Sequence, residues 1–346
     1  MTTLLLTLDY ELYGNGSGDV FRHVVEPTAR LLEIADKYGV RFTFFFEVIE
    51  YWKLKEAWQQ GNRMGYDTDP AEAMARQMRE AVGRGHDVQL HLHPQWVGAT
   101  YDAEKGWCVR TDEWRLGDYH REGPLSLTSL MVRGKQTLED MLRPVRPGYR
   151  CTALRAGGYN AQPSEAIVRA MQEAGLTTDS SIYPGGCERG SLSRYDYSSV
   201  TPEKGFWHAG PKLETESNGT LLELPIAAFP IVRLRKYLSA ERIRSLLRNR
   251  KSARDAFEAK TDGSHAGLLQ KISYFFGTEW QTWDFCLFSP ALHKRFLREA
   301  ARLPRDTYVL VGHPKSFTGS QGLEYLLKTI KDKACFPTFT EAIAER

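Results

Sequence analysis

The sequence lacks the features of a membrane protein, a disulfide-rich domain and a thiolate zinc site. Its 346 residues hold no uninterrupted apolar stretch near the roughly 18 residues of a spanning helix. The 5 cysteines are scattered, odd in number and without CxxC spacing, which argues against a disulfide framework or a cysteine-ligated metal. The apolar start, MTTLLLTLD, has no basic segment and reaches Asp9 too soon for a secretory signal. We therefore expect a cytoplasmic protein.

A strong charge of one sign is also missing. Lys and Arg number 46 against 43 Asp and Glu, a net charge of +3, so a nucleic-acid partner is not expected. Hydrophobic residues make up 42% of the chain and charged residues 26%, which is typical of a globular protein with a substantial core. A chain of this length could form one large domain or two smaller ones.

Apolar runs alternate with amphipathic segments along the first hundred residues. Strands are predicted at 3–9, 40–48 and 88–90, and helices begin at Pro27 and after Asp69. This β-α-β-α-β order predicts parallel βα units, in an open doubly wound sheet or in a barrel. Further elements are expected in the second half. They are helices near 135–143, 163–174, 290–302 and 321–331, strand-and-turn units at 175–184 and 221–226, and a strand at 308–311.

Two segments depart from this pattern. Residues 97–134 read as a long irregular insertion rich in Gly, charged and aromatic residues, and such loops are more often functional than idle. Residues of about 232–262 form a basic helical insertion, in which 232–251 hold eight Lys or Arg against Glu241 alone. This helix could meet an acidic glycan, a phosphate-bearing carrier or an anionic membrane surface. The plainer alternative is a solvated helix packed against the body through its leucines.

Polar residues follow four of the predicted strands. Because the carboxyl ends of parallel strands meet at one edge of a sheet, these side chains should face one another there. They are Asp9 and Glu11, His91 and His93, Arg155, and His313.

His91 and His93 share one face of an extended segment, since side chains repeat every two residues. Two imidazoles and one carboxylate make a three-ligand site with room for water, the usual arrangement of hydrolytic zinc. Alone, the HxH pattern reads more simply as one core and one surface histidine. With acids at the same edge, the metal interpretation is favoured.

The neighbouring residues suit proton transfer. Asp9 and Glu11 also lie two apart, so one acid could hold a metal while the other accepts a proton. Arg155 is a natural partner for a buried carboxylate. His313, between Gly312 and Pro314, could protonate a leaving group. Each also has a plain structural reading: a solvated loop, a surface arginine or a strand cap.

Taken together, these segments resemble the polysaccharide deacetylase (NodB-homology) family, in a divergent branch with HLHP. The resemblance is carried by TLDYE (7–11), GVRFTFFFEV (39–48), RGHDVQLHLHP (84–94), LRAGGYN (154–160), GLTTDSSIYP (175–184) and VLVGHP (309–314). It implies an α/β fold, a distorted (β/α) barrel with insertions, that forms one catalytic domain over residues 1–346. It also implies removal of an acyl group from a sugar by a metal-bound water. The metal would be one divalent ion, zinc first, with cobalt, nickel or manganese as alternatives.

Carried over by position, Asp9 resembles the family's general base, Arg155 the residue that orients it, and His313 the general acid. Glu11, His91 and His93 would hold the metal. The backbone N–H near Tyr159 would help to hold the oxyanion. Tyr159 and the aromatics of 96–119, Trp96 among them, could stack on sugar rings, although aromatic residues are equally core residues.

Two departures from the family pattern leave the site open. Tyr10 separates two acids that are adjacent in the family, so Glu11 or Asp9 could be the metal acid. Gln95 stands where the family places its second histidine, and His93 is the substitute. The leading interpretation is a deacetylase for an N-acetylated sugar or glycan precursor in cell-envelope biosynthesis, possibly lipid- or nucleotide-linked. The alternatives are a hydrolase of another amide, such as a formamide or a ureide, and a catalytically silent carbohydrate-binding module.

Overall fold

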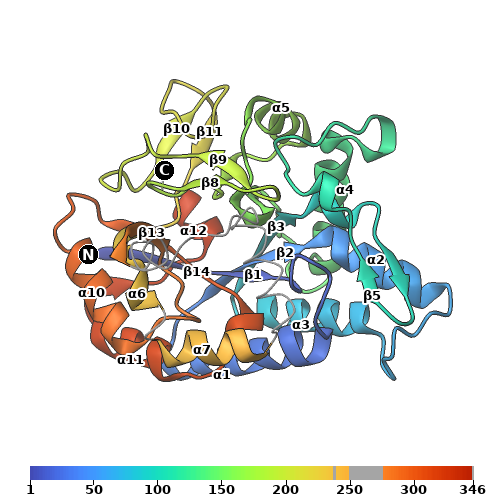
Figure 1. Cartoon of the computed structure of the whole chain (residues 1–346), viewed down its shortest axis with the longest axis horizontal. Coiled ribbons are helices and arrows are strands. Elements are labelled where there is room, and N and C mark those ends of the chain that lie inside the picture. Colours follow the sequence, from blue (N-terminus) through green and yellow to red (C-terminus); the bar gives the residue numbers. More distant parts are fainter. Residues whose placement is uncertain (237–238, 249–275, 345–346) are drawn as a thin grey trace.

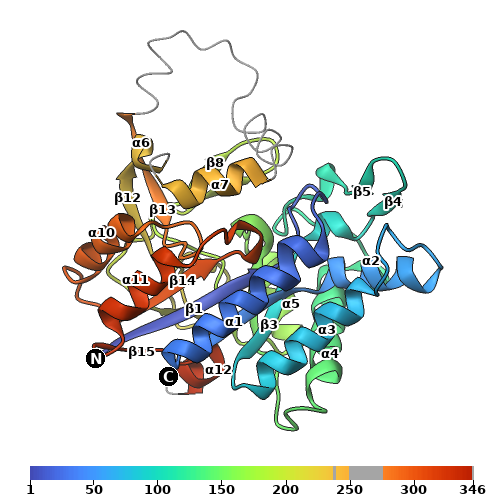
Figure 2. The ribbon, with the colours of Figure 1, turned by 90° about the horizontal axis from the view of Figure 1, so that it is seen from below.

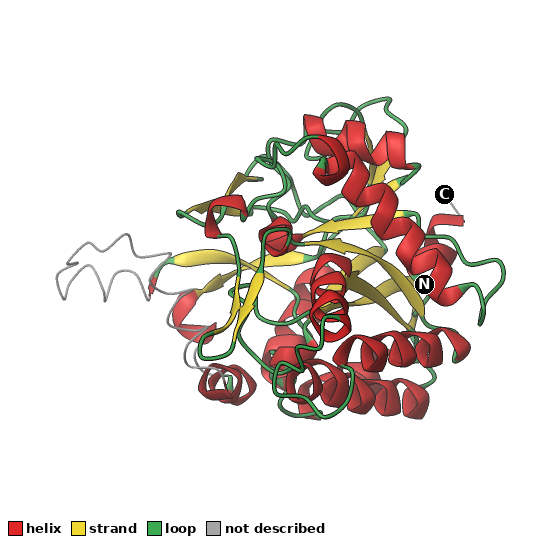
Figure 3. Cartoon of the chain, turned by 90° about the vertical axis from the view of Figure 1, so that its right-hand side faces the viewer, coloured by secondary structure: helices red, strands yellow, loops and turns green. Residues whose placement is uncertain are grey.

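The computed structural model describes residues 1–236, 239–248 and 276–344. One curled sheet lies at its centre, with helices around it (Figure 3). The sheet runs in the order β10-β11-β7-β6-β3-β2-β1-β14, with β15 beside β1. Its strands are β1 (Thr2–Tyr10), β2 (Phe42–Glu47), β3 (Asp87–Leu92), β6 (Ala153–Ala156), β7 (Thr178–Asp179), β10 (Trp207–Ala209), β11 (Leu221–Glu223), β14 (Thr307–Gly312) and β15 (Ala334–Cys335).

The central strands are parallel, which brings their carboxyl ends to one edge. Strand β1 pairs in parallel with both β2 and β14, and β3 pairs in parallel with β2 and β6. Among the described strands of this sheet, β10 alone runs antiparallel to its neighbour, β11. Every residue of β2 is buried, as expected of a central strand covered on both faces. Within the residues that the structure describes, the sheet does not close into a regular barrel through a full strand pair. Single bridges to β14 close it instead, in which Ile226 pairs with Val309 and Asp284 pairs with Val311. The expected distorted (β/α) barrel is confirmed.

Helices surround the sheet (Figures 1 and 2). Asp69 caps α3 by accepting from the N–H groups of Ala71 and Glu72, and Gly39 ends α1 in the left-handed region, as the sequence predicts. The helices are α1 (Glu26–Tyr38), α2 (Val48–Gln59), α3 (Pro70–Gly83), α4 (Leu127–Leu142), α5 (Glu165–Ala174), α6 (Arg233–Lys236), α7 (Ala240–Arg248), α10 (Pro290–Ala300), α11 (Gln321–Ile330) and α12 (Phe339–Ala344). None in the described part of the chain is long and apolar enough to cross a bilayer.

Two helices differ from the sequence-based expectation. Helix α2 was not expected, because its aromatic and branched start, VIEYW, continues the apolar run of β2. The Glu47 carboxylate caps it by accepting from the N–H groups of Ile49 and Glu50. Helix α4 begins at Leu127, earlier than expected, with the Ser126 hydroxyl as its cap.

The two insertions are partly regular. Residues 97–134 contain the hairpin of β4 (Thr100–Asp102) and β5 (Gly106–Cys108) and the first turns of α4. A second hairpin, which lies outside both insertions, joins β8 (Cys187–Arg189) and β9 (Arg194–Asp196). The basic insertion leaves the sheet through β12 (Ala228–Val232), carries α6 and α7, and returns through β13 (Thr278–Thr282). The rest of the predicted basic segment, 237–238 and 249–262, lies outside the described residues.

Candidate metal and catalytic site

The predicted polar residues meet at the carboxyl edge of the sheet. Asp9 lies within β1, His91 within β3 and Arg155 within β6, and Glu11, His93 and His313 follow directly after their strands. Strands β1 and β14 are neighbours, and His91 stands beside Arg155 in the register of β3 and β6. The six side chains therefore lie close together although they span 304 positions of the sequence from Asp9 to His313.

Asp9 is held by Arg155, which is completely buried. The Arg155 Nη1 donates to Asp9 Oδ1 at 2.6 Å and to the Thr7 hydroxyl at 2.9 Å. Its Nε and Nη2 donate to the backbone oxygen and hydroxyl of Ser180, and its plane stacks on the Phe45 ring. Burial alone would raise the pKa of Asp9, but the charges of Arg155, His91 and His313 together outweigh it, so the pKa lies below its usual value. Asp9 is thus an ionised carboxylate with one oxygen committed to Arg155.

The second acid, Glu11, faces the two histidines. Its Oε2 lies 2.6 Å from His93 Nε2 and 3.5 Å from His91 Nε2. One ligand atom from each of the three residues falls within 4.8 Å of the others. His91 Nδ1 donates to the Arg155 backbone oxygen at 2.8 Å, which leaves its buried Nε2 as a lone pair without a hydrogen bond. Two imidazole nitrogens and a carboxylate aimed at one point fit a divalent metal.

Gln95 does not face this cluster directly; it supports His93. It is fully buried, and its amide nitrogen lies 2.7 Å from His93 Nδ1. In this orientation Nδ1 accepts, so the ring proton stays on Nε2 and points at Glu11. The same amide nitrogen donates to the Gly14 backbone oxygen at 3.3 Å. A half-turn of the amide gives up that longer bond, presents Oε1, which has no hydrogen bond of its own, and lets Nδ1 donate. His93 Nε2 is then free to bind a metal, so Gln95 suits the role of a positioning residue.

Lys315 is a site residue that the sequence analysis missed. Its Nζ donates to Glu11 Oε1 and to the Leu12 backbone oxygen, both at 2.7 Å. Burial would raise the pKa of Glu11, but the charges of Lys315 and His93 hold it well below its usual value. Glu11 therefore offers one oxygen to the histidines while the other is taken. A lysine right after His313 and Pro314 gives no pattern in the sequence that would have marked it.

His313 faces Oδ2 of Asp9, the oxygen that is not hydrogen-bonded to Arg155. Its Nδ1 donates to Asp284 Oδ2 at 3.1 Å, and its Nε2 lies 3.5 Å from Asp9 Oδ2. Burial would lower the pKa of His313, but the hydrogen bond and charge of Asp284 raise it above the ordinary value. Asp284 was also missed by the sequence analysis. Its only signal is an acid within the aromatic run WDF after β13.

A tight turn covers the histidines. Gly157 packs so closely that a Cβ there would lie 2.5 Å from the His93 ring, so only glycine fits. Tyr159 follows in the left-handed region, at a φ of 61°, which is uncommon for a tyrosine. The Tyr197 hydroxyl donates to the Tyr159 backbone oxygen at 2.7 Å and fixes this peptide. The half-buried Tyr159 thus lies in a held turn beside the metal ligands.

Trp96 is placed differently from the expectation. It is 1% exposed, and its ring packs edge-on against Trp107 at a centroid distance of 5.4 Å. Such a side chain supports the insertion from within and presents no face to a sugar. The prediction of Trp96 as a substrate contact is therefore corrected, and the ambiguity of aromatic residues between core and binding surface explains the error.

Two further buried acids lie behind the metal side. Glu50 accepts the Leu12 N–H with both oxygens, and burial raises its pKa to about 8. Glu47 keeps Oε2 unpaired, and burial, with the nearby charges of Glu50 and Glu11, raises its pKa well above the usual value. With a pKa of about 8, Glu50 is mostly protonated at neutral pH. Glu11 is the acid on this side whose pKa is lowered, so it is the ionised carboxylate there.

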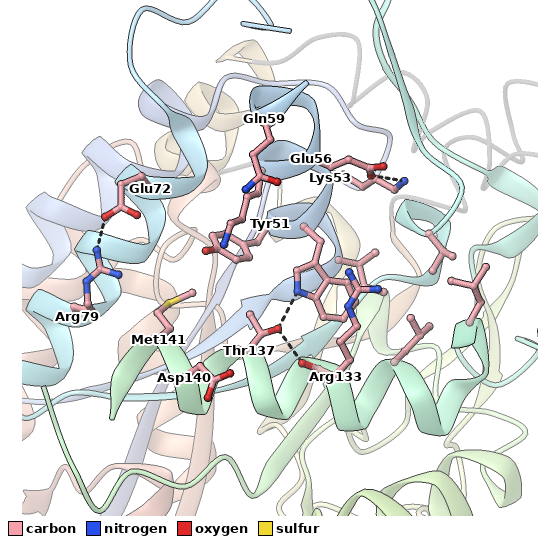
Figure 4. Close-up of a pocket in the computed structure, with 16 residues that line it drawn as sticks. Tyr51, Lys53, Glu56, Gln59, Glu72, Arg79, Arg133, Thr137, Asp140 and Met141 are labelled. Atoms are coloured by element: carbon pink, nitrogen blue, oxygen red, sulfur yellow. Dashed lines mark hydrogen bonds and ion pairs between the residues drawn. The ribbon is translucent and has the colours of Figure 1, made fainter. Parts of the chain in front are cut away.

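A separate groove of about 760 Å³ lies between α2, α3 and α4 (Figure 4). Its charged groups pair with one another, as in the ion pairs of Arg79 with Glu72 and of Lys53 with Glu56. The Arg133 guanidinium covers the Trp52 ring. None of the residues described above for the metal or proton-transfer groups lines this groove, so it is not the catalytic centre.

No family model matches the sequence. Solved structures similar to the chain include a polysaccharide deacetylase from Bacillus cereus, at 11% identity and a TM-score of 0.40, covering 99% of this chain and 94% of that one. A Mycobacterium smegmatis protein named provisionally a polysaccharide deacetylase shares 15% identity at a TM-score of 0.47, covering 99% and 90%. An allantoinase shares 12% at 0.44, covering 98% and 88%. The sequence resembles the same family, and because these TM-scores are below 0.5 the chemistry rests on the contacts above.

Proposed function

We propose that the protein is a metal-dependent hydrolase that removes the acetyl group from an N-acetylated sugar. The observation that carries this proposal is the convergence of Glu11, His91 and His93. Asp9 and, next to it, His313 lie beside this group. Amide hydrolysis by a metal-dependent enzyme needs a metal site, a general base and a general acid, and these residues could supply all three. A single structural histidine pair would need neither flanking group.

The residues divide the proton transfers between them. Asp9 is kept ionised by Arg155 and is the group that takes a proton from the attacking water. His313, whose pKa is raised by its hydrogen bond to Asp284 and by the charge of Asp284, gives a proton to the departing amine. The Tyr159 backbone N–H is the donor proposed for the oxygen that becomes negative. When bound, the metal supplies polarisation of the acyl carbonyl and a more acidic water.

The donor set of two imidazoles and one carboxylate favours zinc, and cobalt, nickel and manganese remain the alternatives to be measured. As substrate class we propose an N-acetylated glycan precursor of cell-envelope biosynthesis, lipid- or nucleotide-linked. An amine leaving group is what His313 beside Asp284 would serve.

Metal content and acetate release test the proposal together. We expect purified protein to retain about one equivalent of metal, to lose it in His91→Ala, and to keep it in His208→Ala, an exposed histidine that serves as the control. Metal-loaded protein should release acetate from N-acetylhexosamine-containing compounds. Hydrolysis of formyl or ureido compounds without any acetate release would instead identify another amide hydrolase. Protein that binds no metal at micromolar concentration would support a silent carbohydrate-binding module.

A further inference from the structure

Helix α7 turns its apolar side away from the protein. Ile243, Leu246 and Leu247 follow the spacing of one helix face, and they are 46%, 41% and 57% exposed. The face toward the body is polar instead, because Glu241 is buried and the Ser239 hydroxyl before the helix bonds to it. The plain alternative from the sequence, a helix packed through its leucines, is therefore wrong. Leu234 and Phe276 of the same insertion are exposed as well.

Arginines gather around the same helix. Arg248 at its end donates to the backbone oxygens of Phe317 and Arg22. The side chains of Arg22, Arg30 and Arg244 are exposed nearby. Burial, and after it the charges of Arg30 and Arg22, lower the pKa of Arg248, which shows that the positive charges are close enough to repel. We call the surface formed by Arg22, Arg30, Ile243, Arg244, Leu246 and Leu247 the α7 surface.

The α7 surface adjoins the catalytic edge. The short turn Pro314–Ser316 follows His313 directly, and α7 packs against it. The Thr318 hydroxyl also donates to the Glu241 backbone oxygen. Figure 1 shows α7 at the lower edge of the molecule, and α7 and α1 both contact the turn Pro314–Ser316. Figure 2 shows the two helices apart from each other. A partner that binds here would therefore lie next to the loop that carries His313.

We propose that the α7 surface docks onto an anionic lipid bilayer. Exposed apolar side chains on a short helix, bordered by arginines, are the combination that inserts at the level of lipid headgroups while the cations meet the phosphates. The proposal goes beyond the hydrolase function and can be tested without any substrate.

Charge complementarity favours this occupant over a second copy of the chain. A symmetric contact between two α7 surfaces would bring like charges together, because the surface carries several arginines and the one acid of α7, Glu241, is buried. A bilayer that contains anionic lipid offers the opposite charge and an apolar layer at once.

Co-sedimentation with lipid vesicles tests the proposal on the full chain. We expect the protein to pellet with vesicles of phosphatidylcholine and phosphatidylglycerol, much less with phosphatidylcholine alone, and less at high salt. The pair Leu246→Ser and Leu247→Ser should weaken binding by about tenfold or more. The matched control is Val132→Ser with Val145→Ser, two exposed valines elsewhere.

The charge contribution has its own matched pair. Arg22→Glu with Arg244→Glu should weaken binding by at least about tenfold, since each cation near an anionic surface contributes roughly 1 kcal/mol. Lys331→Glu with Lys333→Glu makes the same change of net charge on exposed lysines of another region and should bind like the wild type. Circular dichroism establishes that each variant is folded.

Three results would overturn the proposal. One is no pelleting with anionic vesicles at low salt. Another is equal binding of the α7 variants and their controls. The third is a dimer in sedimentation velocity that Leu246→Ser with Leu247→Ser dissolves while no vesicle is bound, which would assign the surface to a second copy. Because no substrate is used, none of these outcomes depends on the proposed deacetylation.

Discussion

The two sides of the site are held in different ways. On the proton-transfer side, Asp9 and Arg155 project from regular strands, and each of the three guanidinium nitrogens donates to a buried partner. On the metal side, Glu11 and His93 stand just past their strands and depend on Lys315 and other residues of loops. The comparison shows that two acids only two positions apart receive different roles from their cations. Asp9 gives one oxygen to Arg155 and keeps the other beside His313. Glu11 gives one oxygen to Lys315 and turns the other toward His91 and His93.

The largest expected effect separates the two sides by activity. Asp9→Asn removes the proposed base while leaving Glu11 and both histidines in place. We expect acetate release at saturating metal to fall by roughly 10²–10⁴-fold with metal content unchanged. Elemental analysis and initial rates measure the two quantities on one sample. The exposed Asp112→Asn is the control. If the variant loses its metal as well, Asp9 belongs to the ligand set and the division between the two acids is wrong.

The next effect concerns the metal side alone. Gln95→Leu keeps the size of the side chain but removes the partner of His93 Nδ1. Supporting residues of this kind typically change metal affinity by about 10–100-fold, and we expect that loss with the rate at saturating metal largely retained. A competition titration with a chelating indicator dye measures the affinity. The exposed Gln172→Leu should behave like the wild type. Unchanged metal affinity in Gln95→Leu would rule out the positioning role.

A smaller effect is expected in the pH profile. The charge of Asp284 raises the pKa of His313, and the proposed acid works only while protonated. Activity should therefore fall as the pH rises through the pKa of His313. Asp284→Asn removes the charge, so this alkaline fall should move to lower pH. Rates across a pH series at saturating metal measure it. If activity falls at the same pH in both proteins, His313 is not the group whose deprotonation causes the alkaline fall.

The sequence predicted one side of this comparison better than the other. Residues inside parallel strands, such as Asp9, His91 and Arg155, can be placed at one edge because strand direction fixes where each strand ends. Asp284 and Lys315 could not be placed, since each lies in a turn just past the end of a strand, β13 and β14, where the direction of a side chain depends on tertiary packing. Trp96 failed for another reason, because an aromatic residue satisfies a core and a sugar surface equally well.

The same limit applies to the elements around the site. Strands β1 and β2 were predicted from their apolar runs, yet α2 was not, because its cap is the Glu47 side chain at the end of a strand. Gly134 in the middle of α4 also hides that helix. A Cβ there would lie 2.7 Å from Leu90 of β3, so the glycine marks close packing. A contact of this kind joins segments that are distant in the sequence, so a pattern within one segment cannot predict it.

The smallest expected effect is on stability and concerns the neutral acids behind the metal side. Burial raises the pKa of Glu50 to about 8, against 4.5 ordinarily. Between these values the unfolded chain has lost the proton that the folded protein keeps, so the free energy of unfolding falls as the pH rises, by at most roughly 1.4 kcal/mol per pH unit. Below this window the effect is absent, and above it the loss is complete.

Glu50→Gln removes this titration, so the free energy of unfolding of the variant should fall less between about pH 5 and about pH 8. Urea unfolding of metal-free protein across that range measures the slope. Glu56→Gln, an exposed glutamate of the same helix, should keep the slope of the wild type. Equal slopes in the Glu50 variant and the wild type would mean that Glu50 is ionised in the folded protein. The metal side would then hold a second carboxylate charge beside Glu11, and Glu11 would no longer be the one ionised acid assigned to that side.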